Sequence, residues 1–272
     1  MNHKQSKAVL CLDIDGTLTD AQENIHPRDI ATLAHFPDHI QLIFTTGRIL
    51  HSALGILHEN NLFNEEPFPL PGVFMNGGVA LLPAEERVVE HLLTPDLLVD
   101  LAELPLSFPD TCFAFFEPDR VSLVNPTSFG QEIAEGHYFY SDVISLDDIP
   151  REVVKLMAIN QDKNVLEAIK ARTQNLPAEM GYTLPFLYEI NAPGINKAAT
   201  LRVLLDELEM ASLPVFAAGD GENDLSLMTL TERFFAPLTA NETVRKRADE
   251  IINRQENGIL MPVLSVINQL LD

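Results

Sequence analysis

The stretch AVLCLDIDGTLTD, residues 8–20, places two aspartates two positions apart at the end of an apolar run. A short apolar run that ends in an Asp-Gly turn is typical of a buried parallel strand. Side chains two positions apart on a strand point the same way, so Asp13 and Asp15 can face one pocket. Adjacent carboxylates repel each other unless a proton or a cation lies between them, and a divalent metal with oxygen ligands is the simplest partner.

Two other interpretations of this stretch compete with a metal site. An EF-hand calcium loop needs glycine at its sixth position, where this chain has Leu18. A plain turn with solvated acids stays open from this stretch alone, because Asp-Gly pairs are common in turns.

A second acidic cluster lies far along the chain, in FAAGDGENDLSLM, residues 216–228. Asp220, Asn223 and Asp224 follow another apolar run there. Ligands of an open parallel sheet bind at the carboxyl ends of its strands, so two acidic strand ends can meet at one metal. Mg²⁺ prefers a few carboxylates together with water and a substrate phosphate. Taken alone, this segment could also be a solvated loop.

Two further segments suit the binding of an anion. FTTGR, residues 44–48, ends a predicted strand with Thr46 and Gly47, and a hydroxyl with a free backbone N–H at a helix start can bind phosphate. An ordinary threonine N-cap is the alternative. Lys197 is at the start of a predicted helix, where a positive charge interacts unfavourably with the helix dipole. This unfavourable position suggests that the lysine has a functional role. A solvated lysine is nevertheless the simpler interpretation of that residue alone.

The remaining pattern alternates between strands and helices, which predicts an α/β protein with a doubly wound parallel sheet. Residues 83–187 differ, because they combine β-rich runs with a helix, and we expect an inserted α+β domain there. The two halves of the core would be residues 1–82 and 188–272. Helices are predicted at 26–36, 48–61, 163–173, 195–210 and 239–252, and further strands at 39–48, 72–78, 111–125, 182–191 and 214–218.

Taken together, DxDGT, TGR, a lysine and GDxxND in this order resemble the haloacid dehalogenase (HAD) superfamily, specifically its Cof-type phosphatases of subfamily IIB. The resemblance covers nearly the whole chain and includes MNGG at 75–78 and EINAPGINKAATL at 189–201. Two positions depart from the family pattern. Ala198 stands where glycine is usual, and Thr239 stands where asparagine is frequent.

The resemblance implies a Rossmann-like HAD core, an inserted cap that closes over the site, and hydrolysis of a phosphoric monoester. Asp13 would attack phosphorus and form an aspartyl-phosphate, and Asp15 would act first as general acid and then as general base. The resemblance also implies that phosphate is bound by Thr46, Gly47, Lys197, Asn223 and the backbone N–H of Ile14. It implies that Mg²⁺ is bound by the Asp13 carboxylate, the Asp15 carbonyl and Asp220. Asp224 would act through a water or orient the loop, and Arg48 would contact phosphate or cap the structure.

The composition of the chain limits the kinds of molecule that the protein is expected to bind. The 272 residues carry a formal net charge of −22, so nucleic acid and anionic membranes are poor partners. The N-terminal apolar run is too short for a signal peptide or a membrane span, and we expect a cytoplasmic protein. The expected substrate is a small phosphorylated metabolite, with sugar phosphates the leading class. A phosphomutase and a non-catalytic binding protein on the same fold stay open, as does the oligomeric state.

Overall fold

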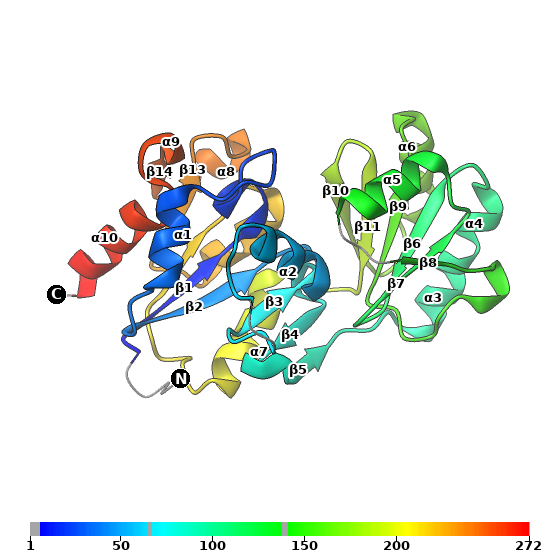
Figure 1. Cartoon of the computed structure of the whole chain (residues 1–272). Coiled ribbons are helices and arrows are strands. Elements are labelled where there is room, and N and C mark those ends of the chain that lie inside the picture. Colours follow the sequence, from blue (N-terminus) through cyan, green and yellow to red (C-terminus); the bar gives the residue numbers. More distant parts are fainter. Residues whose placement is uncertain (1–5, 65–66, 138–140, 272) are drawn as a thin grey trace. The chain divides into compact units, whose positions relative to one another are not determined.

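The computed structural model describes residues 6–64, 67–137 and 141–271. The chain folds into two compact units (Figure 1). The second unit contains Glu90–Ile195 together with Ile49–Ser52, and the first contains the remaining described residues. The second unit thus begins and ends a few residues later than the predicted insertion at 83–187. The difference arises because the chain stays in the first sheet until Glu90 and in the second sheet until Asn191.

The first unit is built on an eight-stranded sheet whose central strands are parallel. Strand β1 (Ala8–Leu12) lies between β2 (Ile40–Thr45) and β12 (Val215–Ala218), and Leu12 pairs in register with both Phe44 and Ala218. The three strands therefore end at the same edge. The complete order is β14-β13-β12-β1-β2-β3-β4-β5, where the outer strands are β3 (Gly72–Phe74), β4 (Val79–Leu81), β5 (Arg87–Glu90), β13 (Arg233–Pro237) and β14 (Glu250–Ile252).

Burial explains why β1 sits in the middle. All five of its residues are fully buried, which requires cover on both faces of the sheet. Val9 and Cys11 belong to a core cluster with Leu201 and Leu204 of α7 (Lys197–Glu207). The other helices of this unit are α1 (Pro27–Ala34), α8 (Glu242–Arg245), α9 (Arg254–Asn257), α10 (Leu260–Leu271) and, from Ala53 onward, α2 (Leu50–Glu59). Helix α1 packs against α10.

The helix predicted over 239–252 is wrong in its second half. Only Glu242–Arg245 is helical, and Glu250–Ile252 instead forms β14, parallel to β13. Asp249 accounts for the change: its backbone N–H donates to Phe234 O, and its carboxylate accepts the Phe234 N–H at 2.8 Å. These contacts bind the segment to β13 and complete the edge of the sheet.

The second unit is an α+β structure on a six-stranded, mostly antiparallel sheet with the order β10-β11-β9-β6-β7-β8. Phe113, Leu156 and Tyr188 from three neighbouring strands pack in one core cluster with Leu101 and Leu166 from two helices. The strands are β6 (Cys112–Phe116), β7 (Val121–Val124), β8 (Ser141–Val143), β9 (Lys155–Ile159), β10 (Glu179–Leu184) and β11 (Leu187–Asn191), and the helices are α3 (Pro95–Ala102), α4 (Leu104–Ser107), α5 (Ser128–Gly136) and α6 (Lys163–Thr173).

The α/β class and the sheet architecture predicted from the sequence are confirmed. Within the described residues, none of the helices combines the length and the apolar character needed to cross a bilayer.

Candidate active site

Asp13 follows the last residue of β1 and is buried, with 4% of its surface exposed. Its backbone N–H donates to Ala218 O at 3.0 Å, which continues the pairing of β1 with β12 by one residue. The chain then makes a tight turn over Ile14–Leu18, closed by the Thr19 N–H donating to Ile14 O at 2.9 Å. This turn carries Asp15 and starts at the shared edge of the three strands.

Gly16 lets this turn lie against the second acidic segment. Its φ is +72°, and a Cβ added there would lie 2.2 Å from Asp220 Oδ2. Any other side chain would therefore both adopt a strained backbone and collide with Asp220.

Lys197 joins the two acidic segments. It is the first residue of α7, which Asn196 caps by accepting the Ala199 N–H at 3.0 Å. Its fully buried ammonium lies 2.8 Å from Asp13 Oδ1 and 2.6 Å from Asp224 Oδ1. Burial alone lowers the pKa of Lys197, but these two carboxylates outweigh it and raise the pKa above its ordinary value, so the ammonium stays charged.

Three carboxylates converge beside this lysine. Asp13, Asp220 and Asp224 each present an oxygen, and these oxygens lie within 4.8 Å of one another. Burial, and then the neighbouring Asp224, raise the pKa of Asp13 well above its usual range and that of Asp220 to about 6. With three carboxylates beside one ammonium, the cluster holds more negative charge than Lys197 alone balances. An all-oxygen donor set with excess negative charge fits Mg²⁺.

The members of this cluster differ in how strongly the protein holds them. Asp224 Oδ2 accepts the backbone N–H groups of Asp220 at 3.1 Å and Gly221 at 3.0 Å, while Oδ1 is paired with Lys197. Asp220 accepts a long hydrogen bond of 3.5 Å from the Thr17 hydroxyl. Asp224 is therefore committed to holding the loop and Lys197, whereas Asp220 keeps more capacity for a metal.

Thr46 and Gly47 form the turn after β2. The buried Thr46 hydroxyl accepts the Arg48 N–H at 3.1 Å, and the Thr46 N–H donates to Val73 O at 2.8 Å. A Cβ at Gly47 would lie 3.0 Å from Asn76 Oδ1, so the glycine admits that amide. The turn is thereby held from both sides at the shared strand edge.

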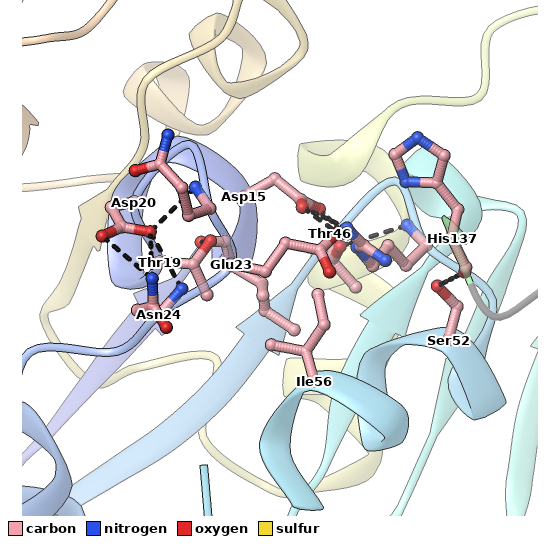
Figure 2. A network of polar contacts seen from close by, with 12 residues as sticks. Asp15, Thr19, Asp20, Glu23, Asn24, Thr46, Ser52, Ile56 and His137 are labelled. Carbon is pink, nitrogen blue, oxygen red and sulfur yellow. Dashed lines mark hydrogen bonds and ion pairs between the residues drawn. The ribbon is translucent and has the colours of Figure 1, made fainter. Parts of the chain in front are cut away.

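Arg48 pairs with Asp15. Its Nε lies 2.8 Å from Asp15 Oδ2, and its Nη2 lies 2.7 Å from Asp15 Oδ1 and 2.5 Å from Glu23 Oε1. Figure 2 shows Asp15, Glu23 and Thr46 around this ion pair. The Arg48 side chain is buried, while that of Asp15 is 48% exposed. The ion pair therefore engages both carboxylate oxygens of Asp15 while leaving that side chain partly exposed.

Asn76 takes part in the site, although no role was predicted for it. Asn223 Nδ2 donates to its Oδ1 at 2.9 Å, and its backbone N–H donates to Thr46 O at 3.1 Å. Met75, Asn76 and Gly77 all have positive φ, and for Met75 and Asn76, which carry a Cβ, such strained conformations are concentrated at functional sites. The signal in the sequence was the MNGG segment, which follows an apolar strand as the other motifs do.

Hydrogen bonds and ion pairs thus connect Asp13, Lys197 and Asp224 in one group. A second group consists of Asp15, Arg48, Thr46, Asn76 and Asn223, in which the Arg48 N–H joins the ion pair to Thr46. The Gly16 turn brings the Asp15 segment against Asp220. Ile14 is buried at the start of that turn. The roles assigned to these residues from the sequence stay predictions.

Comparison with known proteins decides the family. A sequence model of the family described as haloacid dehalogenase-like hydrolase matches residues 10–262. The chain belongs to this family. The HAD resemblance found in the motifs is therefore confirmed, and the protein is a hydrolase of this class.

Individual relatives of this HAD-like hydrolase are distant. It is 26% identical over 242 residues to a phosphoglycolate phosphatase of Haloarcula marismortui, with 89% of each chain covered. It is 22% identical over 254 residues to the 5-amino-6-(5-phospho-D-ribitylamino)uracil phosphatase YcsE of Bacillus subtilis, with 92% of each covered.

Solved structures share the fold of the HAD-like hydrolase. A haloacid dehalogenase-like hydrolase from Bacteroides thetaiotaomicron superposes with a TM-score of 0.80 at 23% identity, covering 97% of this chain and 100% of that one. A HAD subclass IIB sugar phosphatase superposes with a TM-score of 0.77 at 18% identity, covering 96% and 98%.

Proposed function

We propose that this HAD-like hydrolase is a Mg²⁺-dependent phosphatase that hydrolyses small phosphorylated metabolites through an aspartyl-phosphate on Asp13. The observation that carries the proposal is the buried ammonium of Lys197, held between Asp13 and Asp224 beside Asp220. A fixed cation next to an ionised carboxylate suits attack on a dianionic phosphate, because it reduces the repulsion between the two.

In the first step, the free oxygen of the Asp13 carboxylate attacks phosphorus while the bond from phosphorus to the ester oxygen breaks. Asp15, in its protonated form, donates a proton to the departing oxygen and thereby becomes a carboxylate. In the second step, Asp15 takes a proton from water, the water oxygen attacks phosphorus, and the bond to Asp13 breaks. The products are the alcohol and inorganic phosphate, and both aspartates return to their starting states.

Arg48 suits the second of these steps. It pairs with the ionised form of Asp15, which is the form that accepts a proton from water. Protonation of Asp15 for the first step would weaken this pair, and Arg48 would keep Glu23 as a partner.

The phosphoryl oxygens would be bound at the strand edge by Lys197, the Thr46 hydroxyl, the Gly47 and Ile14 N–H groups and the Asn223 amide. Mg²⁺ would be held by the carboxylates of Asp13 and Asp220 and by the carbonyl of Asp15. When bound, it would neutralise charge on the phosphoryl group and help to align that group with Asp13.

Small phosphomonoesters are the proposed substrate class. The named activities of the two relatives are directed at phosphoglycolate and at a phosphorylated ribityl compound. Sugar phosphates and related polyol phosphates are the leading group within this class, because the second of these compounds carries its phosphate on a sugar-derived chain.

The test uses p-nitrophenyl phosphate and measures inorganic phosphate released by the wild type and by Asp13→Asn. We expect the variant to lose turnover, since an amide is a poor nucleophile toward phosphorus. Asp206→Asn, at an exposed position on α7, serves as the control and should keep wild-type activity. Circular dichroism and thermal unfolding would show that both variants are folded.

Turnover by folded Asp13→Asn would remove the assignment of the nucleophile. Release of phosphate by the wild type without a bisphosphate activator would separate a phosphatase from a phosphomutase, which must return the phosphoryl group to its substrate.

A further inference from the structure

Arg254 reaches the turn that carries Asp15 from the far end of the chain. Its Nη1 donates to the main-chain carbonyl oxygens of Thr17 at 2.6 Å and Gly16 at 3.3 Å, and also to that of Thr19. One guanidinium nitrogen thus contacts three carbonyls of a single turn. Arg254 and Thr17 lie 237 positions apart in the sequence, so only the tertiary fold brings them together.

The segment around Arg254 is itself anchored. Asn253 caps the short helix α9 by accepting the Gln255 N–H at 3.3 Å, and Arg28 of α1 donates to Asn257. The carboxylate of the buried Asp29 accepts the backbone N–H groups of Ile259 at 2.9 Å and Leu260 at 2.8 Å. Arg254 is therefore presented from a fixed base and does not behave as a free surface arginine.

The turn that supplies these carbonyls is irregular. The turn is not a continuous helix, since Asp15 has φ −70° and ψ 127° and Gly16 has φ +72°. Backbone carbonyls in a part-buried position need hydrogen-bond donors, and leaving them without partners is costly. A planar guanidinium with several N–H groups suits this arrangement better than an ammonium does.

Asp13 and Asp15 depend on this turn to different degrees. Asp13 is fixed independently by the hydrogen bond to Ala218 O and by Lys197. The carboxylate of Asp15 is held by Arg48, but its backbone lies one residue before Gly16, inside the turn that Arg254 contacts. Loss of the Arg254 contacts should therefore displace Asp15 more than Asp13.

We propose that Arg254 is a positioning residue that, through the carbonyls of Gly16, Thr17 and Thr19, sets the place of Asp15 relative to the leaving group. The inference rests on the proposed function, because it takes Asp15 as the general acid. Arg254 touches neither the substrate nor the reacting atoms in this scheme and acts through the backbone of the turn.

Two substrates of nearly the same shape separate this role from a structural one. Phenol, like tyrosine, has a pKa of about 10, so the departure of phenolate is helped by a proton donor. The nitro group makes p-nitrophenol a stronger acid, and its anion leaves with less help. Because kcat/KM reports steps up to the first phosphoryl transfer, the ratio of kcat/KM for the two substrates measures the contribution of Asp15 to that step.

The experiment compares the wild type with Arg254→Met and Arg254→Lys, at saturating Mg²⁺. We expect Arg254→Met to lower kcat/KM for phenyl phosphate by about tenfold or more, in line with the cost of misplacing a catalytic group, and kcat/KM for p-nitrophenyl phosphate by less than about threefold. Arg254→Lys should recover part of the difference, because it keeps the charge but not the planar fork. Arg247→Gln, at an exposed position in the same unit, is the matched control and should behave as the wild type.

Asp15→Asn provides the reference for the test. If Asp15→Asn selectively loses activity on phenyl phosphate and folded Arg254→Met loses both activities equally or neither, the positioning role is overturned while the proposed function stands. If Asp15→Asn shows no selectivity, the acid role of Asp15 fails and the inference fails with it. Thermal unfolding of each variant identifies a general loss of folded protein, which would lower both activities alike.

Discussion

Lys197 is the residue on which the site depends most. It is a fully buried cation whose two partners, Asp13 and Asp224, come from loops after different strands. A buried charge is tolerated only when it is paired, and removing one partner leaves the others uncompensated. The contacts that hold Asp13 in place therefore also hold β1, α7 and the loop after β12 together.

Replacing Lys197 with methionine should abolish phosphate release and destabilise the protein by about 3–5 kcal/mol, because two buried carboxylates would lose their counter-ion. Urea unfolding followed by fluorescence or circular dichroism would measure the change. The double variant Lys197→Met/Asp224→Asn should be more stable than Lys197→Met, since it removes one of the repelling charges.

Lys246→Met is the control for that prediction. Lys246 pairs with Glu242 at 2.7 Å, but both side chains are 71% exposed. An exposed pair of this kind contributes roughly 0–1 kcal/mol. A Lys197→Met variant that unfolds at the same urea concentration as the wild type would contradict the interpretation of Lys197 as a buried counter-ion.

The turn over Ile14–Leu18 connects the buried strand β1 to the other segments of the candidate site. It leaves β1 with Asp13, carries Asp15, lies against Asp220 through Gly16, and receives Arg254 on its carbonyls. Asp220 and Arg254, which contact the turn, come from different parts of the chain. The geometry of the turn is therefore set by its surroundings more than by its own hydrogen bonds.

Gly16→Ala should reduce activity far more than Gly194→Ala. Both glycines have nearly the same positive φ, so both substitutions cost about 1–2 kcal/mol of backbone strain. A Cβ at Gly194 has nothing within 4 Å, whereas a Cβ at Gly16 would collide with Asp220. We expect Gly194→Ala to keep wild-type kcat/KM for p-nitrophenyl phosphate. Gly16→Ala should lose about tenfold or more, because it would displace Asp220, the proposed metal ligand. Equal kcat/KM values for the two variants would show that contact with Asp220 does not matter.

The whole molecule carries an excess of negative charge, with 40 acidic and 18 basic residues. Asp13, Asp220 and Asp224 concentrate part of that charge in a buried cluster. Added salt screens the repulsion among these charges, so the effect of a bound metal must be separated from the effect of ionic strength.

Removal of divalent metal by a chelator should stop phosphate release, and added Mg²⁺ should restore it. Mg²⁺ should also raise the melting temperature, by about 5 °C when it is present at about a hundred times its Kd. NaCl at equal ionic strength is the control for screening. Asp220→Asn should remove the Mg²⁺-specific part of the shift, while Asp206→Asn should keep it. Activity that is indifferent to the chelator would eliminate the metal role.

Much of this architecture could be predicted from local patterns. A parallel sheet with polar strand ends is indicated by the apolar run of residues 8–12, by the acids that follow it and by the alternation of strands and helices. Each of these features can be recognised from residues that are close together in the sequence. The structure confirms the sheet and brings the Asp13 and Asp220 segments together at one edge. The helix predicted over 239–252 failed in its second half because Asp249 pairs with Phe234, a contact that helical propensity cannot anticipate.

What the amino-acid order determined by itself was the set of chemical groups and the strand ends on which they stand. Only the tertiary structure decided which groups face each other. It pairs Lys197 with Asp13, 184 positions away in the sequence, and Arg48 with Asp15. It also places Arg254 on the carbonyls of Thr17 and its neighbours. The physical reason is that strand and turn formation depends on neighbouring residues, whereas the pairing of buried charges depends on how separate elements pack, and that packing is a property of the complete fold.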